Sequence, residues 1–78
     1  MKNGELIDMN STMIDVWRYL TEHVEEEGTF IPYNQIRDAV GKKSRHAISY
    51  AVERLRKCGK ISISDRKIYV LEEYRDVT

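Results

Sequence analysis

The side chains with the most evident chemistry are cations gathered in residues 41–67. This segment holds nine of the thirteen basic residues against two acidic ones, a local charge of +7. Residues 1–40 hold three basic against eight acidic residues, so the zero formal charge of the chain averages two unlike regions. A concentrated cationic segment suits contact with a polyanion, because it attracts an array of negative charges.

The cations must be positioned by a helix, because an apolar stripe runs through the same segment. At about 100° per residue, five apolar side chains share one face and predict burial. They are Ala47, Ile48, Ala51, Val52 and Leu55. Ser44 is a favourable N-cap residue and Gly59 suits the position after the last turn. The sequence therefore predicts a helix over residues 44–58, with Cys58 at the edge of its buried face as a small apolar residue.

The outer face of this helix carries hydrogen-bonding side chains. Its members and flanks are Arg45, His46, Ser49, Tyr50, Glu53, Arg54, Arg56 and Lys57. From a helix in the major groove, such side chains bond base edges and phosphates, mostly from the N-terminal half. Tyr50 has two open roles, a DNA contact or packing against the following hairpin. Glu53 would repel phosphate unless it accepts a hydrogen bond from a cytosine amine.

Two further helices are predicted before this one. Met13, Val16, Trp17, Leu20 and Val24 recur at helical spacing, which predicts a helix from Ser11 or Thr12 to near Gly28, with Trp17 in the core. A β-prone piece over residues 29–31 closes at Pro32.

A shorter helix follows Pro32. Ile36, Ala39 and Val40 mark its buried side, and Gly41 suits its C-cap. Only about three residues then separate it from Ser44, which is helix-turn-helix spacing.

After Gly59 the apolar period changes from helical spacing to two. Ile61 and Ile63 alternate with serines, and Ile68 and Val70 alternate with other residues. This pattern predicts a β-hairpin with a basic tip over residues 65–67.

The length and composition of the chain predict a single domain over residues 1–78. Residues 1–10 form an N-terminal arm in this interpretation, and residues 72–78 form a polar tail anchored by Tyr74 and Val77. The chain has no apolar run long enough to span a bilayer, no secretory signal and a single cysteine. We therefore expect a cytoplasmic protein without membrane contact.

The run PYNQIRDAVGKKSRHAISYAVERLRKCGKISIS resembles the winged helix-turn-helix family, and SRHAISYAVERLRKCGKI is similar to the DNA-binding domain of SOS-response repressors. The resemblance covers about residues 11–71. It implies an α+β fold in which a three-helix core carries a C-terminal β-hairpin wing. It also implies that the third helix enters the major groove and that the wing contacts a phosphate or the minor groove.

The predicted function is sequence-specific binding of double-stranded DNA, by a small transcription regulator or a phage or plasmid DNA-binding factor. The predicted contact residues are Lys42, Lys43, Ser44, Arg45, His46, Ser49, Tyr50, Arg54, Lys57, Arg66 and Lys67. Lys42, Lys43 and Ser44 stand at the helix N-terminus, which favours a phosphate. We expect a homodimer on a palindromic site, joined through the arm, the first helix or the tail.

The alternative is a winged-helix protein-interaction module that uses its acidic N-terminal half. No enzyme is predicted, since the sequence lacks a glycine-rich phosphate loop and a nucleophile with a plausible base. No cofactor is expected. The spacing of His23, His46 and Cys58 also predicts no metal site.

Overall fold

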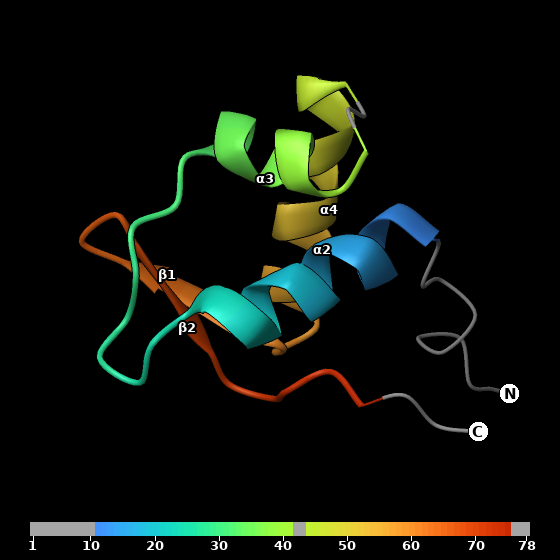
Figure 1. Cartoon of the computed structure of the whole chain (residues 1–78). Helices are drawn as coiled ribbons and strands as arrows, with labels where there is room; N and C mark the ends of the chain where they lie inside the picture. Colours follow the sequence, from blue (N-terminus) through green and yellow to red (C-terminus); the bar gives the residue numbers. More distant parts are fainter. Residues whose placement is uncertain (1–10, 42–43, 76–78) are drawn as a thin grey trace, which may run out of the picture.

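The computed structural model describes residues 11–41 and 44–75. These residues form three helices followed by a two-stranded antiparallel hairpin. In chain order the elements are α2 (Ser11–His23), α3 (Tyr33–Ala39), α4 (Arg45–Lys57), β1 (Ile61–Ser64) and β2 (Lys67–Val70). Figure 1 shows the helices gathered into one cluster, with the hairpin extending from its side. The chain is α+β, and its layout is compatible with a small winged helix.

One apolar core lies between the helices and the hairpin. α2 packs across α4, and α3 packs against α4 as well. The buried members are Met13, Val16, Trp17, Leu20, Ile31, Ile36, Ile48, Ala51, Val52, Leu55, Ile61 and Ile68. The stripe predicted for residues 44–58 therefore faces the core, except that Ala47 is only half-buried. Because one face of α4 is covered in this way, its opposite face must point to solvent.

α2 ends at His23, before the predicted stop near Gly28. The amide of Val24 still donates to the Leu20 carbonyl at 2.9 Å, but the Glu25 amide donates to the Thr29 hydroxyl at 2.8 Å. Three glutamates in a last turn would put negative charge at the negative end of the helix dipole. They lie instead, exposed, in the turn that Gly28 closes.

α3 begins after Pro32 and ends at Ala39. Ile36 is buried and Val40 is half-buried, but Ala39 is exposed, contrary to the prediction. At about 100° per residue, Ala39 and Val40 lie on opposite sides of Ile36, and the packed side is that of Val40. Gly41 has a φ of 103°, the left-handed backbone predicted for the residue after this helix.

Ser44 starts α4 as predicted. Its Oγ accepts a hydrogen bond from the Ala47 amide at 3.0 Å, which satisfies one of the amides that a helix N-terminus leaves without a partner. The far end of α4 also follows the prediction, with Cys58 as the C-cap and Gly59 at a φ of 79°. Both ends of the helix are therefore fixed by local sequence.

The hairpin is tighter than the sequence predicts. Ser64 pairs with Lys67, so Lys67 belongs to β2 and the turn contains only Asp65 and Arg66. Their φ values are 55° and 66°. Positive φ at both central residues is the geometry of a type I′ turn, which matches the twist of the two strands.

A third chain segment joins the hairpin. Thr29 and Ile68 exchange two backbone hydrogen bonds, at 3.1 and 2.9 Å, on the edge of β2 that faces away from β1. The β-prone piece predicted at residues 29–31 thus pairs with β2 through one residue. This pairing fixes the α2–α3 connection beside the hairpin.

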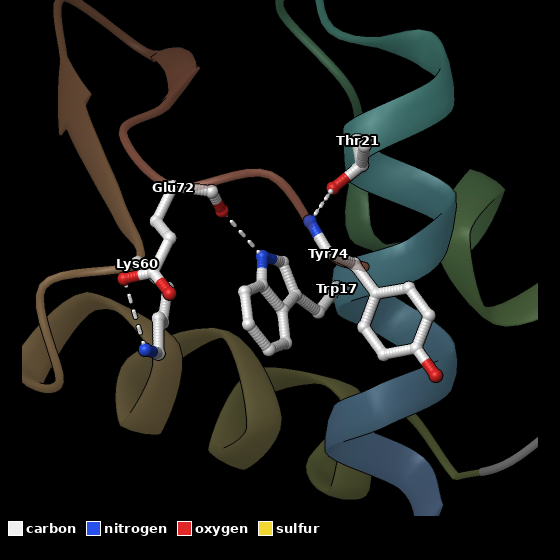
Figure 2. Close-up of polar contacts among 5 residues, drawn as sticks. All are labelled: Trp17, Thr21, Lys60, Glu72 and Tyr74. Atoms are coloured by element: carbon white, nitrogen blue, oxygen red, sulfur yellow. Dashed lines mark hydrogen bonds and ion pairs between the residues drawn. The ribbon is translucent and has the colours of Figure 1, made fainter. Parts of the chain in front are cut away.

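The chain after β2 returns to α2 and is held there by polar contacts (Figure 2). The indole Nε1 of Trp17 donates to the Glu72 carbonyl at 2.7 Å, and the Tyr74 amide donates to the Thr21 Oγ1 at 2.8 Å. The Tyr74 ring meets Trp17 edge to face, with centroids 5.3 Å apart. Tyr74 is therefore the tail anchor that was predicted.

Some predicted features lie outside the described residues. They are the arm of residues 1–10, Lys42, Lys43 and the second tail anchor, Val77. Within residues 11–41 and 44–75, no helix is both long and apolar enough to cross a membrane.

Candidate nucleic-acid interface

The predicted contact residues of α4 lie outside the core. Arg45, His46, Tyr50 and Lys57 are exposed, and Ser49 and Arg54 are half-buried. Ser44 is exposed too, although its Oγ already accepts the capping hydrogen bond. Its hydroxyl proton is left to donate to an outside acceptor. The solvent face of α4 thus presents donors along its whole length.

Tyr50 and Arg54 form a pair along α4. The guanidinium of Arg54 donates to the Tyr50 hydroxyl at 2.8 Å, and its central carbon lies 5.7 Å from the ring centroid. Residues four apart are neighbours on a helix surface, so this pairing needs no other element. It holds a planar cation next to a ring that is 50% exposed.

Glu53, the acidic residue on the outer face, is paired within the helix. Arg56 donates to its carboxylate at 2.7 Å. This hydrogen bond is the main reason that the pKa of Glu53 lies below its ordinary value of 4.5, since it favours the ionised form. Arg56 therefore compensates the charge that was expected to repel phosphate.

Arg66 and Lys67 stand exposed at the hairpin tip. Arg66 occupies the second turn position, where the positive φ favours glycine over residues with a side chain. Lys67 starts β2 beside it. The tip thus carries two neighbouring cations, one of them at a conformational cost.

One open groove joins the tip to the start of α4. Its volume is about 380 Å³, and its walls include Arg45 from α4 and Arg66 from the turn. The remaining lining residues are Phe30, Ile31, Pro32, Tyr33, Asn34, Ile63 and Ile68. No acidic side chain lines it. Two predicted contact residues, far apart in sequence and on different elements, therefore share one concave surface.

Tyr33 lies at the start of α3, and this half-buried residue lines the groove. Burial, more than the nearby Glu53, raises the pKa of Tyr33 above its ordinary value of 10.0. The phenol is thus neutral near pH 7 and keeps a proton to donate.

Sequence reasoning missed the apolar part of the groove. Phe30 is 62% exposed, although the β-prone piece around it predicts no such exposure. Ile63 is 37% exposed, whereas Ile61, two residues earlier on the same strand, is buried. β1 extends beyond the end of the core. Core residues therefore cover Ile61 but leave Ile63 partly exposed. For Phe30, the only sequence signal was an apolar residue two positions before Pro32.

A second groove of about 270 Å³ has the opposite charge. Glu25, Glu26 and Glu73 line it, together with Val24 and the 61% exposed Leu71. The remaining lining residues are Thr21, Tyr69 and Val70. The two grooves reproduce in space the separation of charge seen along the sequence.

Cys58 is exposed, which corrects the prediction of an apolar residue at the edge of the core. It caps α4 beyond the last buried residue of the helix, Leu55, which leaves it outside the core. Within the described ranges, no three histidine, cysteine, aspartate or glutamate side chains gather as metal ligands would.

Comparison with known proteins gives no relative for this chain. It matches no protein-family model, no curated protein and no solved structure. The geometry of the site and the resemblance in its residues are thus the basis for a functional proposal.

Proposed function

We propose that this chain is a small winged helix-turn-helix protein that binds double-stranded DNA in a sequence-specific manner. The supporting observation is the groove that holds Arg45 of α4 and Arg66 of the hairpin tip together. A helix and a neighbouring basic hairpin are what a winged helix presents to a duplex. A transcription regulator or a phage or plasmid DNA-binding factor would use such a surface.

In this proposal α4 enters the major groove with its N-terminal half. Arg45, His46 and Ser49 contact base edges, while the Tyr50–Arg54 pair lies further along the helix. Ser44 and the amides of the first turn contact a phosphate. Arg66 and Lys67 contact the backbone beside the helix, which fixes the angle at which α4 enters.

Two variants separate the roles of base and phosphate contacts. If Arg45 forks onto a guanine, Arg45→Ala costs about 1–3 kcal/mol on the selected site and relaxes specificity at one position. Lys67→Ala should weaken binding to all duplexes alike and reduce the salt slope by about one unit. Sites selected from random duplexes, followed by polarisation titrations at several salt concentrations, measure both effects. Equal losses on selected and random DNA for both variants would contradict these roles.

We also propose that the protein binds as a homodimer on a palindromic site. A single winged helix inserts one recognition helix, and dimeric readers of this kind gain affinity from two half-sites about one helical turn apart. The arm, α2 and the tail are the candidate interfaces. Analytical ultracentrifugation should detect a dimer on DNA, and a strict monomer both free and bound would end this proposal.

The acidic groove favours a second candidate function, a protein-interaction module. Glu25, Glu26 and Glu73 line the same groove as the exposed Leu71, a combination that suits a partner with basic and apolar residues. Winged-helix domains with different functions share one fold, so the layout of the elements alone does not distinguish DNA binding from protein interaction. Salt-sensitive duplex binding at low ionic strength favours the first function, and its complete absence favours the second.

A further inference from the structure

We infer that Phe30 and Ile63 form an apolar contact to DNA, packing against a deoxyribose next to a phosphate that binds Arg66. This inference rests on the proposed function and assigns a task to the groove that links α4 to the hairpin tip. It adds Phe30 and Ile63 to the proposed DNA-contact residues, although neither lies on α4 and neither is basic.

The two side chains are exposed in the same place. Among the described residues, four large apolar side chains are exposed, and Phe30 and Ile63 both line this one groove. Each is held there by pairing: Thr29, next to Phe30, bonds Ile68, and Ile63 lies opposite Ile68 across the hairpin. Backbone pairing on both sides of Ile68 therefore fixes the apolar pair in space. Exposure of this kind points to a surface that is covered by a partner.

The chemistry of the walls selects the partner. Arg45 and Arg66 have no ion-pair partner among the described residues, and no acid lines the groove. A groove that holds both cationic and apolar side chains complements a sugar–phosphate strand, in which charged phosphates alternate with largely apolar sugar faces. Half or more of protein–DNA hydrogen bonds go to phosphate and sugar, so a strand in this groove is an ordinary mode of contact.

Apolar and ionic contacts differ in their dependence on salt. Each phosphate neutralised by a cation releases counterions and steepens the slope of log K against log salt, by about 0.9 in B-DNA. Packing of Phe30 on a sugar releases no counterions. Loss of Phe30 should therefore lower affinity by the same factor at every salt concentration, whereas loss of Arg66 should change the slope.

The experiment compares Phe30→Ala with Leu71→Ala, a matched control because Leu71 is 61% exposed and lines the acidic groove. Affinity for a selected duplex is measured by polarisation at four or more salt concentrations. We expect Phe30→Ala to raise Kd by about tenfold, with an unchanged slope, from burial of most of a phenyl ring. Leu71→Ala should match the wild type, and Phe30→Leu should retain most of the affinity. Urea unfolding checks that all variants are folded.

Several outcomes would overturn the inference while leaving the proposed function standing. One is duplex binding by Phe30→Ala that equals that of Leu71→Ala. Another is a changed salt slope in Phe30→Ala, since that would mean Phe30 acts only by positioning the arginines. A third is self-association or binding of an acidic peptide that Phe30→Ala abolishes while DNA affinity stays unchanged. Failure of the wild-type protein to bind any duplex would instead remove the proposed function and this inference together.

Discussion

Arg66 occupies a turn position whose backbone favours glycine. Its φ of 66° places it in the left-handed region, which costs about 1–2 kcal/mol for a residue with a side chain. Strained backbone often marks a functional position, because the surrounding structure must tolerate it. A guanidinium at the hairpin tip, facing the groove of Arg45, is the benefit that would offset this cost.

Arg66→Gly should therefore stabilise the fold while weakening DNA binding. Relief of strain, reduced by the greater flexibility of glycine in the unfolded chain, should raise the free energy of unfolding by about 0.5–1 kcal/mol. Arg66→Ala keeps the strain and loses the same charge. Urea denaturation and duplex titration of both variants test the point. Equal stability of the two variants would contradict the role given to the turn geometry.

Glu53 gives a pH-dependent prediction. Its folded-state pKa lies below the ordinary 4.5 because Arg56 donates a hydrogen bond to the carboxylate. The pair therefore stabilises the fold above about pH 4.5, and this contribution disappears as pH falls through the folded-state pKa. An NMR titration should find the midpoint of Glu53 below 4.5, and Arg56→Gln should raise it. Arg37→Gln, which removes the pairing with Asp38 instead, should leave that midpoint unchanged.

At the level of elements, the tail stabilises the helix–hairpin arrangement through its backbone. The Glu72 carbonyl accepts from the Trp17 indole, while the Glu72 side chain pairs with Lys60 at 3.0 Å and is 59% exposed (Figure 2). A surface ion pair of that kind contributes at most about 1 kcal/mol, and a part-buried hydrogen bond about the same before packing is counted. Trp17 adds the packing of a ring that is 9% exposed.

Trp17→Phe should accordingly destabilise the protein more than Glu72→Gln. We expect a loss of about 1.5–3 kcal/mol for the first, from the indole hydrogen bond and the smaller ring, and less than about 1 kcal/mol for the second. Urea unfolding monitored by circular dichroism compares them. A larger effect of Glu72→Gln would mean that the side-chain ion pair holds the tail.

The elements differ in how far sequence predicts them. The ends of α4 are predictable because Ser44 and Gly59 act locally, and its buried face follows from periodicity. The end of α2 is not predictable in this way, since three consecutive glutamates fit a frayed helix end as well as a turn. The hydrogen bond from the Glu25 amide to the Thr29 hydroxyl makes this segment a turn. The exposure of Phe30 and Ile63 depends on where the core ends, and a local sequence pattern does not predict this. The predicted cations of α4 and the tip lie on the surface, but only the fold brings Arg45 and Arg66 into one groove.

At the scale of the whole molecule, two grooves divide the surface by charge. The groove with Arg45 and Arg66 contains no acid, and the groove with Glu25 and Glu73 contains no base. A molecule with zero net charge can thus attract a duplex with one side and repel it with the other. This asymmetry should orient the protein on DNA, with the acidic turn after α2 directed away from the phosphates.

Mapping the bound surface by NMR tests the central claim most directly. In ¹⁵N–¹H spectra recorded during titration with a duplex, we predict the largest shifts at the N-terminal half of α4, at the Asp65–Arg66 turn and at Phe30. The amides of Glu25, Glu26 and Leu71 should barely move. Shifts centred on those three residues, or no shifts at low salt, would contradict the account.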